Sequence, residues 1–466
     1  MNALYARRRA QLSKDLGSGL LLFLGNNEVG MNYADNTYRF RQDSTFLYFF
    51  GLDYPGLAAI IDVDEDQQIV FGNELTIDDI VWTGIQPTLR EKAATVGIGL
   101  TRPMSELKNY IVNAQRKGQP VHFLPPYRGD HQVQLLDLLG ILPAEQAGRS
   151  SLPLIKAIVK QRNYKDLDEI RAIEESVDIS TEMHLAAYRK VRPGVHESEV
   201  AAVVEEVACR HGNALAFPTI ATVQGQVLHN HGFIHELHEG DIFLLDAGAE
   251  TRTHYAGDLS SSMPVGEQFT QRQAEVYEIH LRSFKAAVDT LKVGVPFRNA
   301  HIAAATEIAR GMKELGLMKG DPGEAAECGA YALFFPCGLG HMVGLDVHNM
   351  ENLGEQYVGY AEGEQKSTQF GFKSLRLARP LEPGFVFTVE PGIYFIPELM
   401  DKWEAEGQFR DFICYDRLGP WRDFTGLRNE LNYAVMPDGT VRQLGTIRKP
   451  MTIEEVYAAK SSNPAH

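Results

Sequence analysis

The pattern of apolar and polar positions divides the chain into two parts. In the first 150 residues, positions 3–16 (ALYARRRAQLSKDL) follow a helical pattern, and apolar runs bounded by turn residues predict strands at 19–25, 57–63 and 67–72. Helical and strand patterns that alternate in this way are typical of an α/β domain.

A second part begins near residue 153. Residues 165–191 carry apolar side chains at helical spacing, and Pro193-Gly194 predicts the end of this helix. We therefore predict two domains, 1–152 and 153–466, which agrees with the length of 466 residues.

The second part also contains an internal repeat. Residues 190–206 resemble 290–308, and residues 237–250 resemble 381–395. The latter two share the pattern L-x-x-G-x-x-F-x-x-acid-x-G, in which Asp246 corresponds to Glu390. Two copies of a helix-helix-strand unit, each with an acid at a strand end, predict an α+β domain with a pseudo-twofold axis and a shared central site. A chance match between short strand-turn patterns is the alternative.

Charge and apolar content narrow the possible partners. With 45 basic and 61 acidic residues, the net charge is −16, and no run is dense in Lys or Arg, so we expect no nucleic-acid partner. The apolar run 17–25 is too short to cross a bilayer and lacks a small-residue cleavage site, and no other run approaches ~18 residues. We therefore expect a buried strand there and no membrane partner.

The cysteines indicate the compartment. They form no C-x-x-C pair, and their irregular spacing is typical of free thiols in a reducing compartment, so we expect a cytoplasmic protein. The four cysteines are Cys209, Cys328, Cys337 and Cys414.

Several acids adjoin strand-like apolar runs. Asp246 follows the run 242–245, and Asp258, Glu390 and Glu430 lie in similar contexts. A buried carboxylate without a partner costs several kcal/mol, so it must be paired, protonated or bound to a metal. Taken singly, each acid could instead be salt-bridged at the surface, and Asp258 could cap a turn.

A glycine-rich segment, 338–349 (GLGHMVGLDVHN), adds His341 and His348. Four carboxylates and one imidazole form an oxygen-rich donor set that suits two adjacent divalent cations such as Mn²⁺, Co²⁺ or Zn²⁺, with two carboxylates bridging. Such a pair lowers the pKa of a shared water and supplies a hydroxide nucleophile at neutral pH. A lone histidine can also be purely structural.

The ordered set of candidate ligands resembles that of the pita-bread metallopeptidases, the methionine aminopeptidase–prolidase–aminopeptidase P superfamily, and within it aminopeptidase P (Xaa-Pro aminopeptidase). Matching segments extend over nearly the whole chain. They are 38–62, 338–355, 374–395 and 424–430. The resemblance implies a non-catalytic α/β N-terminal domain, an α+β pita-bread C-terminal domain and two divalent metal ions, usually Mn²⁺. It also implies a homodimer or homotetramer in which N-terminal domains shape neighbouring sites.

The resemblance implies a role for each metal ligand. Asp246 would bind one ion, Asp258 and Glu430 would bridge both ions, and His341 and Glu390 would bind the second. Glu390 would also help to handle the proton of the bridging hydroxide.

Three further site residues follow from the same resemblance. His348 would hydrogen-bond the scissile carbonyl and stabilise the oxyanion. His229 would lie beside the substrate, and Arg428 would support the bridging acid without binding a metal itself. We expect His231, His235 and His238 on a solvated turn, and Tyr255 and Tyr394 to be packing residues.

Two positions depart from the family pattern. Cys337 stands where the family usually has a histidine, four residues before His341. Residues 428–431 read Arg-Asn-Glu-Leu where the family commonly has Arg-Ile-Glu-Asp. We interpret Cys337 as an inert small hydrophobic residue rather than a new nucleophile.

The resemblance implies an aminopeptidase that releases the N-terminal residue from peptides with proline in second position, by means of a metal-bridged hydroxide. One alternative is a related enzyme, either an Xaa-Pro dipeptidase (prolidase) or a non-peptidase hydrolase like creatinase. Another is a weakly active or inactive metal-binding homologue that binds peptides.

Overall fold

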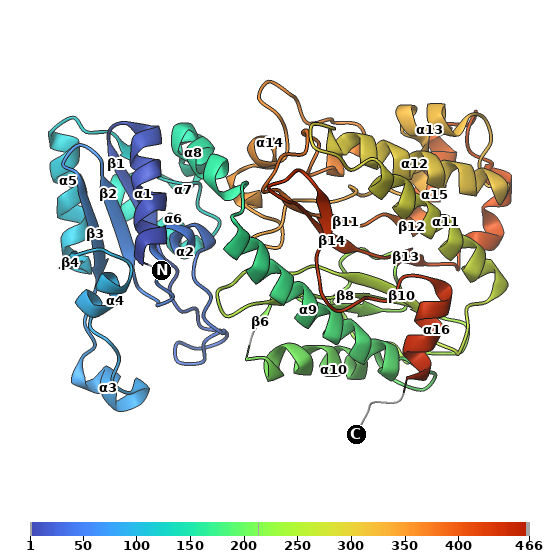
Figure 1. The fold of residues 1–466 in the computed structure, drawn as a ribbon, viewed down its shortest axis with the longest axis horizontal. Coiled ribbons are helices and arrows are strands. Elements are labelled where there is room, and N and C mark those ends of the chain that lie inside the picture. The colour runs from blue at the N-terminus through green and yellow to red at the C-terminus, as the bar shows by residue number, and fades with distance from the viewer. Residues whose placement is uncertain (1, 213, 463–466) are drawn as a thin grey trace. The chain divides into compact units, whose positions relative to one another are not determined.

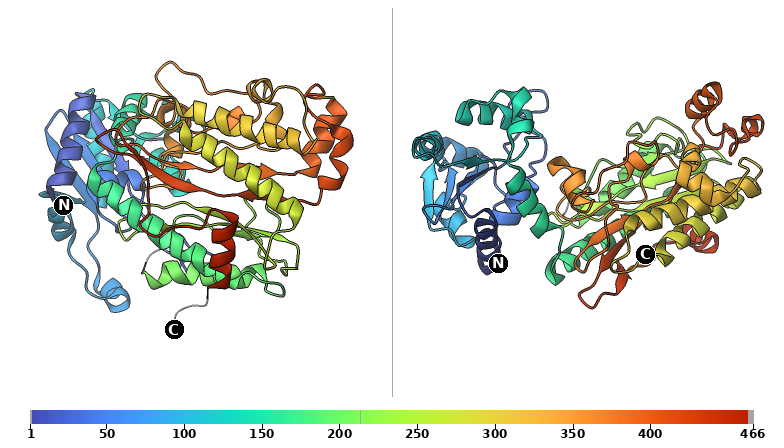
Figure 2. Two further views of the ribbon diagram at one scale, coloured as in Figure 1. Left: turned by 45° about the vertical axis from the view of Figure 1, so that its right-hand side comes forward. Right: turned by 90° about the horizontal axis from the view of Figure 1, so that it is seen from above.

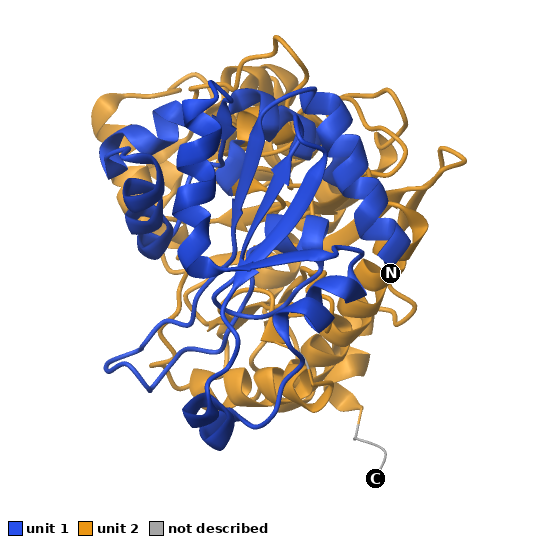
Figure 3. Ribbon diagram, turned by 90° about the vertical axis from the view of Figure 1, so that its left-hand side faces the viewer, with its two compact units in different colours: residues 1–162, 352–354 blue, residues 163–351, 355–466 orange. Residues whose placement is uncertain are grey.

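The protein is described by a computed structural model that covers residues 2–212 and 214–462. The chain forms two compact units, which Figure 3 colours separately. The first unit comprises Met1–Arg162 with Asn352–Gly354, and the second comprises Asn163–Glu351 with Glu355–His466. The predicted boundary at residue 153 lies at the start of helix α8 (Leu152–Arg162), and the units divide at the end of this helix.

A five-stranded mixed sheet forms the centre of the first unit (Figure 1). Its strands are β1 (Leu20–Leu24), β2 (Ala58–Asp62), β3 (Gln67–Gly72), β4 (Leu100–Pro103) and β5 (Val121–His122). They are ordered β4-β3-β2-β1-β5, and the β1–β5 and β3–β4 pairs are parallel. The three strands predicted from apolar runs are β1, β2 and β3, so these predictions are confirmed.

The first unit also contains helices, most of which close the core around this sheet, whereas Ile77–Thr83 buries none of its residues. They are α1 (Asn2–Leu16), α2 (Ser44–Phe50), α3 (Ile77–Thr83), α4 (Leu89–Thr95), α5 (Leu107–Arg116), α6 (Gly129–Leu139), α7 (Pro143–Arg149) and α8. Leu22, Ile60 and Phe71 from the sheet share one buried cluster with Leu107 and Ile111 from α5. Removal of this apolar surface from water stabilises the unit.

The second unit is built around two three-stranded antiparallel sheets, ordered β10-β8-β7 and β11-β14-β15, and two shorter strand pairs. The strands are β6 (Ala214–Leu215), β7 (Ile220–Thr222), β8 (Ile242–Asp246), β9 (Ala249–Glu250), β10 (Ser260–Pro264), β11 (Val386–Val389), β12 (Gly392–Tyr394), β13 (Gly426–Arg428), β14 (Leu431–Val435) and β15 (Val441–Gln443).

Two pairs of long helices accompany these sheets. The helices of the second unit are α9 (Leu167–Lys190), α10 (Glu197–Arg210), α11 (Gln271–Asp289), α12 (Phe297–Glu314), α13 (Pro322–Cys328), α14 (Glu355–Val358), α15 (Pro397–Glu406) and α16 (Ile453–Ser461). Figures 1 and 2 show α9 beside α10 and α11 beside α12, and each pair is in contact. None of the helices in the described parts of the chain combines the length and apolar character that a membrane span requires.

The two halves of the second unit repeat the same backbone hydrogen bonds. The amide of Gly194 donates to the carbonyl of Leu237, and the amide of Gly294 donates to that of Leu381, each at 2.8 Å. Gly194 and Gly294 have φ angles of +83° and +82°, which a residue with a side chain rarely adopts. Both contacts join residues that correspond in the repeat, so the predicted internal repeat is confirmed.

Candidate active site

The four candidate carboxylate ligands lie at the ends of paired strands. Asp246 is the last residue of β8, and Asp258 lies two residues before β10. Glu390 directly follows β11, and Glu430 directly precedes β14. Because β8 pairs with β10 and β11 pairs with β14, the two acids of each half are brought together.

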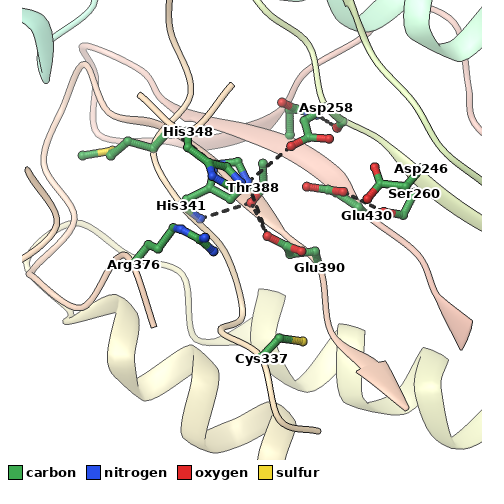
Figure 4. Close-up of polar contacts among 12 residues, drawn as sticks. Asp246, Asp258, Ser260, Cys337, His341, His348, Arg376, Thr388, Glu390 and Glu430 are labelled. Atoms are coloured by element: carbon green, nitrogen blue, oxygen red, sulfur yellow. Dashed lines mark hydrogen bonds and ion pairs between the residues drawn. The ribbon is translucent and has the colours of Figure 1, made fainter. Parts of the chain in front are cut away.

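His341 reaches these acids from a segment that runs beside β11. Its carbonyl accepts a hydrogen bond from the Thr388 amide at 3.0 Å, and its amide donates to the Thr388 hydroxyl at 3.2 Å. His341 Nε2 then lies 3.3 Å from Asp258 Oδ2 and 3.4 Å from Glu390 Oε1 (Figure 4). Donor atoms of Asp258, His341 and Glu430 lie within 4.8 Å of one another.

Three of the acids have an oxygen that lacks a hydrogen-bond partner. Within the described residues, Asp246 Oδ1, Asp258 Oδ1 and Glu430 Oε1 are buried and unpartnered. Leaving such groups unpaired is costly, and a cation would remove the penalty. Carboxylate oxygens with one imidazole nitrogen suit divalent metals such as Mn²⁺ or Zn²⁺, so these residues fit the expected ions.

The protonation equilibria lead to the same conclusion. Burial, reinforced by the charge of Asp246, raises the pKa of Asp258 to about 8. Burial and then the Asp258 charge raise the pKa of Glu430 well above its usual value, and burial raises that of Glu390. Burial lowers the pKa of His341 and favours the neutral ring that binds metals. Without a cation, these acids cannot all be ionised at neutral pH.

Arg428 is the buried counter-charge of the cluster. Its Nη2 lies 2.5 Å from Asp246 Oδ2, its Nη1 donates to the Tyr394 hydroxyl at 2.7 Å, and its Nε donates to Ser260 Oγ at 2.8 Å. Ser260 in turn donates to Glu430 Oε2 at 2.8 Å. Arg428 therefore orients one acid directly and a second acid through a serine.

A cavity of about 640 Å³ opens onto these groups. All five candidate ligands line it, as do Arg428, His229 and His348. Other parts of its wall are apolar and basic. The apolar residues are Phe217, Pro218, Ile220, Leu228 and Val347, and the basic ones are Lys366, Lys373 and Arg376. The cavity is large enough for a small organic ligand.

His348 is held against the ligand histidine. Its ring lies 4.3 Å from that of His341 in an edge-on arrangement, and its Nδ1 lies 2.6 Å from Glu351 Oε2. The hydrogen bond from His348 is the main reason why the pKa of Glu351 falls to about 2. Arg376 lies 3.4 Å from the same carboxylate. These contacts fix the ring orientation of His348.

The neighbouring histidines lie in different environments. His229 and His231 line the cavity with their rings 6.5 Å apart, and burial lowers the pKa of His229. His238 is exposed, as expected for a solvated turn. His235 differs from that expectation, because its Nδ1 lies 3.0 Å from the fully buried carboxylate of Glu197.

Cys337 faces the cavity as a protonated thiol. Its Sγ lies 4.0 Å from the Tyr394 hydroxyl, and burial, followed by the charge of Glu390, raises its pKa to about 12. Such a thiol is a poor nucleophile. Asn429, the second departure, is buried, and its Oδ1 accepts from the Ser262 amide at 3.3 Å and from Lys449 Nζ at 3.5 Å.

Two residues of the site escaped the sequence interpretation. Tyr394 is fully buried, as a packing residue would be, but its hydroxyl also accepts from Arg428. Ser260 joins Arg428 to Glu430, and its position at the start of a buried run of three serines was the one available signal. Tyr255 is buried as expected, and its hydroxyl donates to Glu169 at 2.7 Å.

The fold and the site define the class of protein. Acids at the ends of paired strands, grouped around a neutral imidazole in a cavity, are typical of a metal-binding protein. The model of metallopeptidase family M24 matches residues 171–436, more than half of the chain, and this chain belongs to that family. The N-terminal domain of aminopeptidase P matches residues 5–122.

Individual relatives cover almost the whole chain. Human Xaa-Pro dipeptidase is 28% identical over 98% of this chain and 93% of its own length. A probable Xaa-Pro aminopeptidase of Metarhizium acridum is 27% identical over 94% of this chain and 89% of its own. The structure of proline aminopeptidase P II from Yersinia pestis has a TM-score of 0.81 at 24% identity and covers 99% of this chain and 100% of that one. The predicted fold, an α/β N-terminal domain and a pita-bread C-terminal domain, is confirmed.

Proposed function

We propose that this protein is a metal-dependent aminopeptidase that releases the N-terminal residue from peptides with proline in second position. The observation that carries the proposal is the cluster of four acids and one imidazole beside a cavity, in which three carboxylate oxygens are buried without a hydrogen-bond partner among the described residues. The Xaa-Pro specificity rests on the relatives, whose names state that activity.

The five proposed ligands would hold two divalent cations, Mn²⁺ in the first place and Co²⁺ or Zn²⁺ as alternatives. Asp246 would serve one ion, His341 and Glu390 would serve the other, and Asp258 and Glu430 would be shared by both. Bound divalent cations supply an ionised water at neutral pH and polarise a carbonyl oxygen. Glu390 would also exchange a proton with the attacking water.

The surrounding residues orient the substrate and stabilise charge. His348 uses Nδ1 for Glu351, so Nε2 is the ring nitrogen that would donate to the scissile carbonyl, and donation from both nitrogens requires the imidazolium form. His229 lies in the cavity wall beside the peptide, and Arg428 holds Asp246 in place. Each of these roles is part of the proposal.

The test is the activity of Mn²⁺-reconstituted protein on matched Xaa-Pro and Xaa-Ala peptides of two to nine residues. We expect cleavage of the first bond of the proline peptides and about two metal ions per chain. Comparable kcat/KM values for the two series would contradict the proline requirement. Bound metal without turnover on any peptide would favour an inactive peptide-binding homologue.

A second candidate activity is that of an Xaa-Pro dipeptidase. Lys373 lines the same cavity, and a cationic side chain there favours the free carboxylate of a very short substrate, whereas Lys366 and Arg376 are already paired with Glu355. The same peptide series separates the two activities, since a dipeptidase hydrolyses Xaa-Pro and leaves Xaa-Pro-Xaa intact.

We also propose a homodimer or homotetramer in the cytoplasm. Helix α3 and its flanks expose large apolar side chains: Ile77, Val81, Trp82 and Ile85 are 72–89% exposed. Surfaces of this kind mark protein–protein contacts. Light scattering on the native protein and on Trp82→Ser tests the oligomer, and we expect the variant to dissociate at higher concentrations. The four free thiols agree with a reducing compartment.

A further inference from the structure

Two fully buried histidines stand behind the acids, outside the proposed ligand set. His184 lies on α9 and His280 lies on α11, and both are 0% exposed. The two helices are the first helix of each half of the repeat. Neither histidine lines the cavity.

His184 joins the two segments that carry the acids of the first half. Its Nε2 lies 3.0 Å from the carbonyl oxygen of Ala247, the residue after Asp246. Its Nδ1 lies 2.7 Å from the hydroxyl of Ser261 on β10, three residues after Asp258. Burial lowers the pKa of His184 to about 3, so the ring is neutral. It therefore donates to the carbonyl and accepts from the serine.

His280 occupies the corresponding place in the second half. Its Nε2 lies 2.8 Å from the carbonyl oxygen of Pro391, the residue after Glu390. The same nitrogen lies 3.2 Å from the amide of Asn429, the residue before Glu430. Burial lowers the pKa of His280 to about 4. Because one neutral ring nitrogen either donates or accepts, the shorter bond to Pro391 is the one that forms, with Asn429 in contact.

In the sequence register of the repeat, the two histidines lie one helical turn apart. Ala247 and Pro391 are equivalent, since Asp246 aligns with Glu390. The offset of 100 residues between Gly194 and Gly294 places the equivalent of His184 at position 284, four residues after His280. Residues four apart lie on one face of a helix, so each ring can contact the equivalent strand turn of its own half.

We propose that His184 and His280 are positioning residues of the metal centre. His184 bonds both backbone segments that carry the acids of its half, and His280 bonds the segment after Glu390 and contacts the segment before Glu430. Each histidine thereby sets the spacing between the acids of its own half. The proposal rests on the ligand set proposed above. It predicts that replacement of either histidine weakens metal binding more than replacement of a buried histidine elsewhere in the protein.

The expected size follows from the behaviour of groups that orient metal ligands. Loss of such a group lowers metal affinity or activity by about 10- to 100-fold. We expect His184→Leu and His280→Leu each to weaken Mn²⁺ binding by about 10-fold. The glutamine variants retain a side-chain N–H donor and should bind Mn²⁺ within about 3-fold of the native protein.

The matched control is an equally buried histidine whose contacts do not include the acid-bearing segments. His301 on α12 is 0% exposed, and its Nε2 lies 2.6 Å from the Tyr331 hydroxyl. His301→Leu removes a buried ring and one hydrogen bond without touching either acid-bearing segment. Its melting temperature measures the loss of stability that is unrelated to the metal.

The experiment is a calorimetric titration of the metal-free full-length protein and its variants with MnCl₂, with circular dichroism to verify folding. The expected result is weaker binding in both leucine variants, recovery in the glutamine variants and native affinity in His301→Leu. Peptidase activity of the leucine variants should recover in excess Mn²⁺ with unchanged KM. Native affinity in folded His184→Leu and His280→Leu would overturn the positioning role. No Mn²⁺ binding by the native protein would instead overturn the ligand set itself.

Discussion

The two halves of the second unit place different residues on one backbone pattern. In the first half, antiparallel pairing puts Ser260 opposite Asp246. In the second half, Val389 pairs with Leu431, and the same register continued by one residue puts Glu430 opposite Glu390. A serine and a glutamate thus occupy equivalent positions, so only the second half presents two acids directly across a strand pair.

The first half supplies its second acid two residues earlier, at Asp258. The equivalent residue of the second half is Arg428, whose guanidinium forms an ion pair with Asp246 at 2.5 Å. With four ionised carboxylates and one guanidinium, the cluster has a formal charge of −3. One divalent ion leaves −1 and two leave +1, so the buried charge is nearly balanced by either. The comparison teaches that backbone symmetry builds the site and that broken side-chain symmetry sets its charge.

Replacement of Asp258, whose equivalent in the second half is not an acid, should have the largest effect on activity. Asp258→Asn is expected to abolish turnover, a fall of about 10³-fold or more in kcat, because a neutral amide bridges two cations poorly. Assays on an Xaa-Pro peptide with excess Mn²⁺ measure it. Asp438→Asn, in an exposed turn, is the control. Near-normal activity of Asp258→Asn would remove this residue from the bridging role.

Arg428→Lys tests the cation at the position equivalent to Asp258. Lysine keeps the charge but cannot bond Asp246, Tyr394 and Ser260 together, so we expect about a 10²-fold loss of kcat/KM. Arg442→Lys, an exposed arginine paired with Glu174, should change little. Activity of Arg428→Lys within a factor of about two would show that charge alone is sufficient.

Ser260→Ala tests the position at which the first half has a serine and the second half has Glu430. The hydroxyl accepts from Arg428 and donates to Glu430, and its loss should lower kcat by about 10-fold, the equivalent of about 1.4 kcal/mol. Ser262→Ala removes a buried hydroxyl that bonds only the backbone of Arg428 among the partners described. An equal effect of both variants on kcat would mean that Ser260 has no specific role in the cluster.

Cys337→His introduces the hydrogen-bond donor that the family usually has at this position of the second half. A thiol is a weak hydrogen-bond donor, so we expect histidine to raise kcat by about 5-fold with unchanged metal content. Cys337→Ala distinguishes a new role from an inert one. Loss of turnover in Cys337→Ala, together with alkylation of Cys337 at neutral pH, would show that the thiol has acquired a function.

The pH dependence of metal-free stability tests the burial of Asp258 without any measurement of turnover. The pKa of Asp258 is about 8 in the folded protein, against a usual value of 3.8, so the folded state retains a proton that the unfolded state has lost between these limits. Stability contributed by this proton therefore falls as pH rises from about 4 to 8, by about 1.4 kcal/mol per pH unit. Urea unfolding of the metal-free protein at pH 5–8 measures the slope. Asp258→Asn should flatten it, and an unchanged slope would assign it to other groups.

Much of this site follows from local patterns in the sequence. Apolar runs that end on Asp246 and Glu390 mark two strand ends, and the repeated glycine spacing predicts that these ends are equivalent. Strand alternation and turn preferences act over a few residues, so a single sequence displays them. The identity of the family rests on the same ordered motifs.

The tertiary structure decided which side chains meet. Ser260 and Glu430 are 170 residues apart in the sequence, and Ser262 and Arg428 are 166 residues apart. His184 and His280 lie on amphipathic helices, where a buried histidine resembles any other core residue in the sequence. The sequence by itself determined the strands, the repeat and the order of the candidate ligands, because short-range preferences encode them. Only folding decided the counter-ion, the serine link and the buried histidines, because their partners come from strands and helices that are remote along the chain.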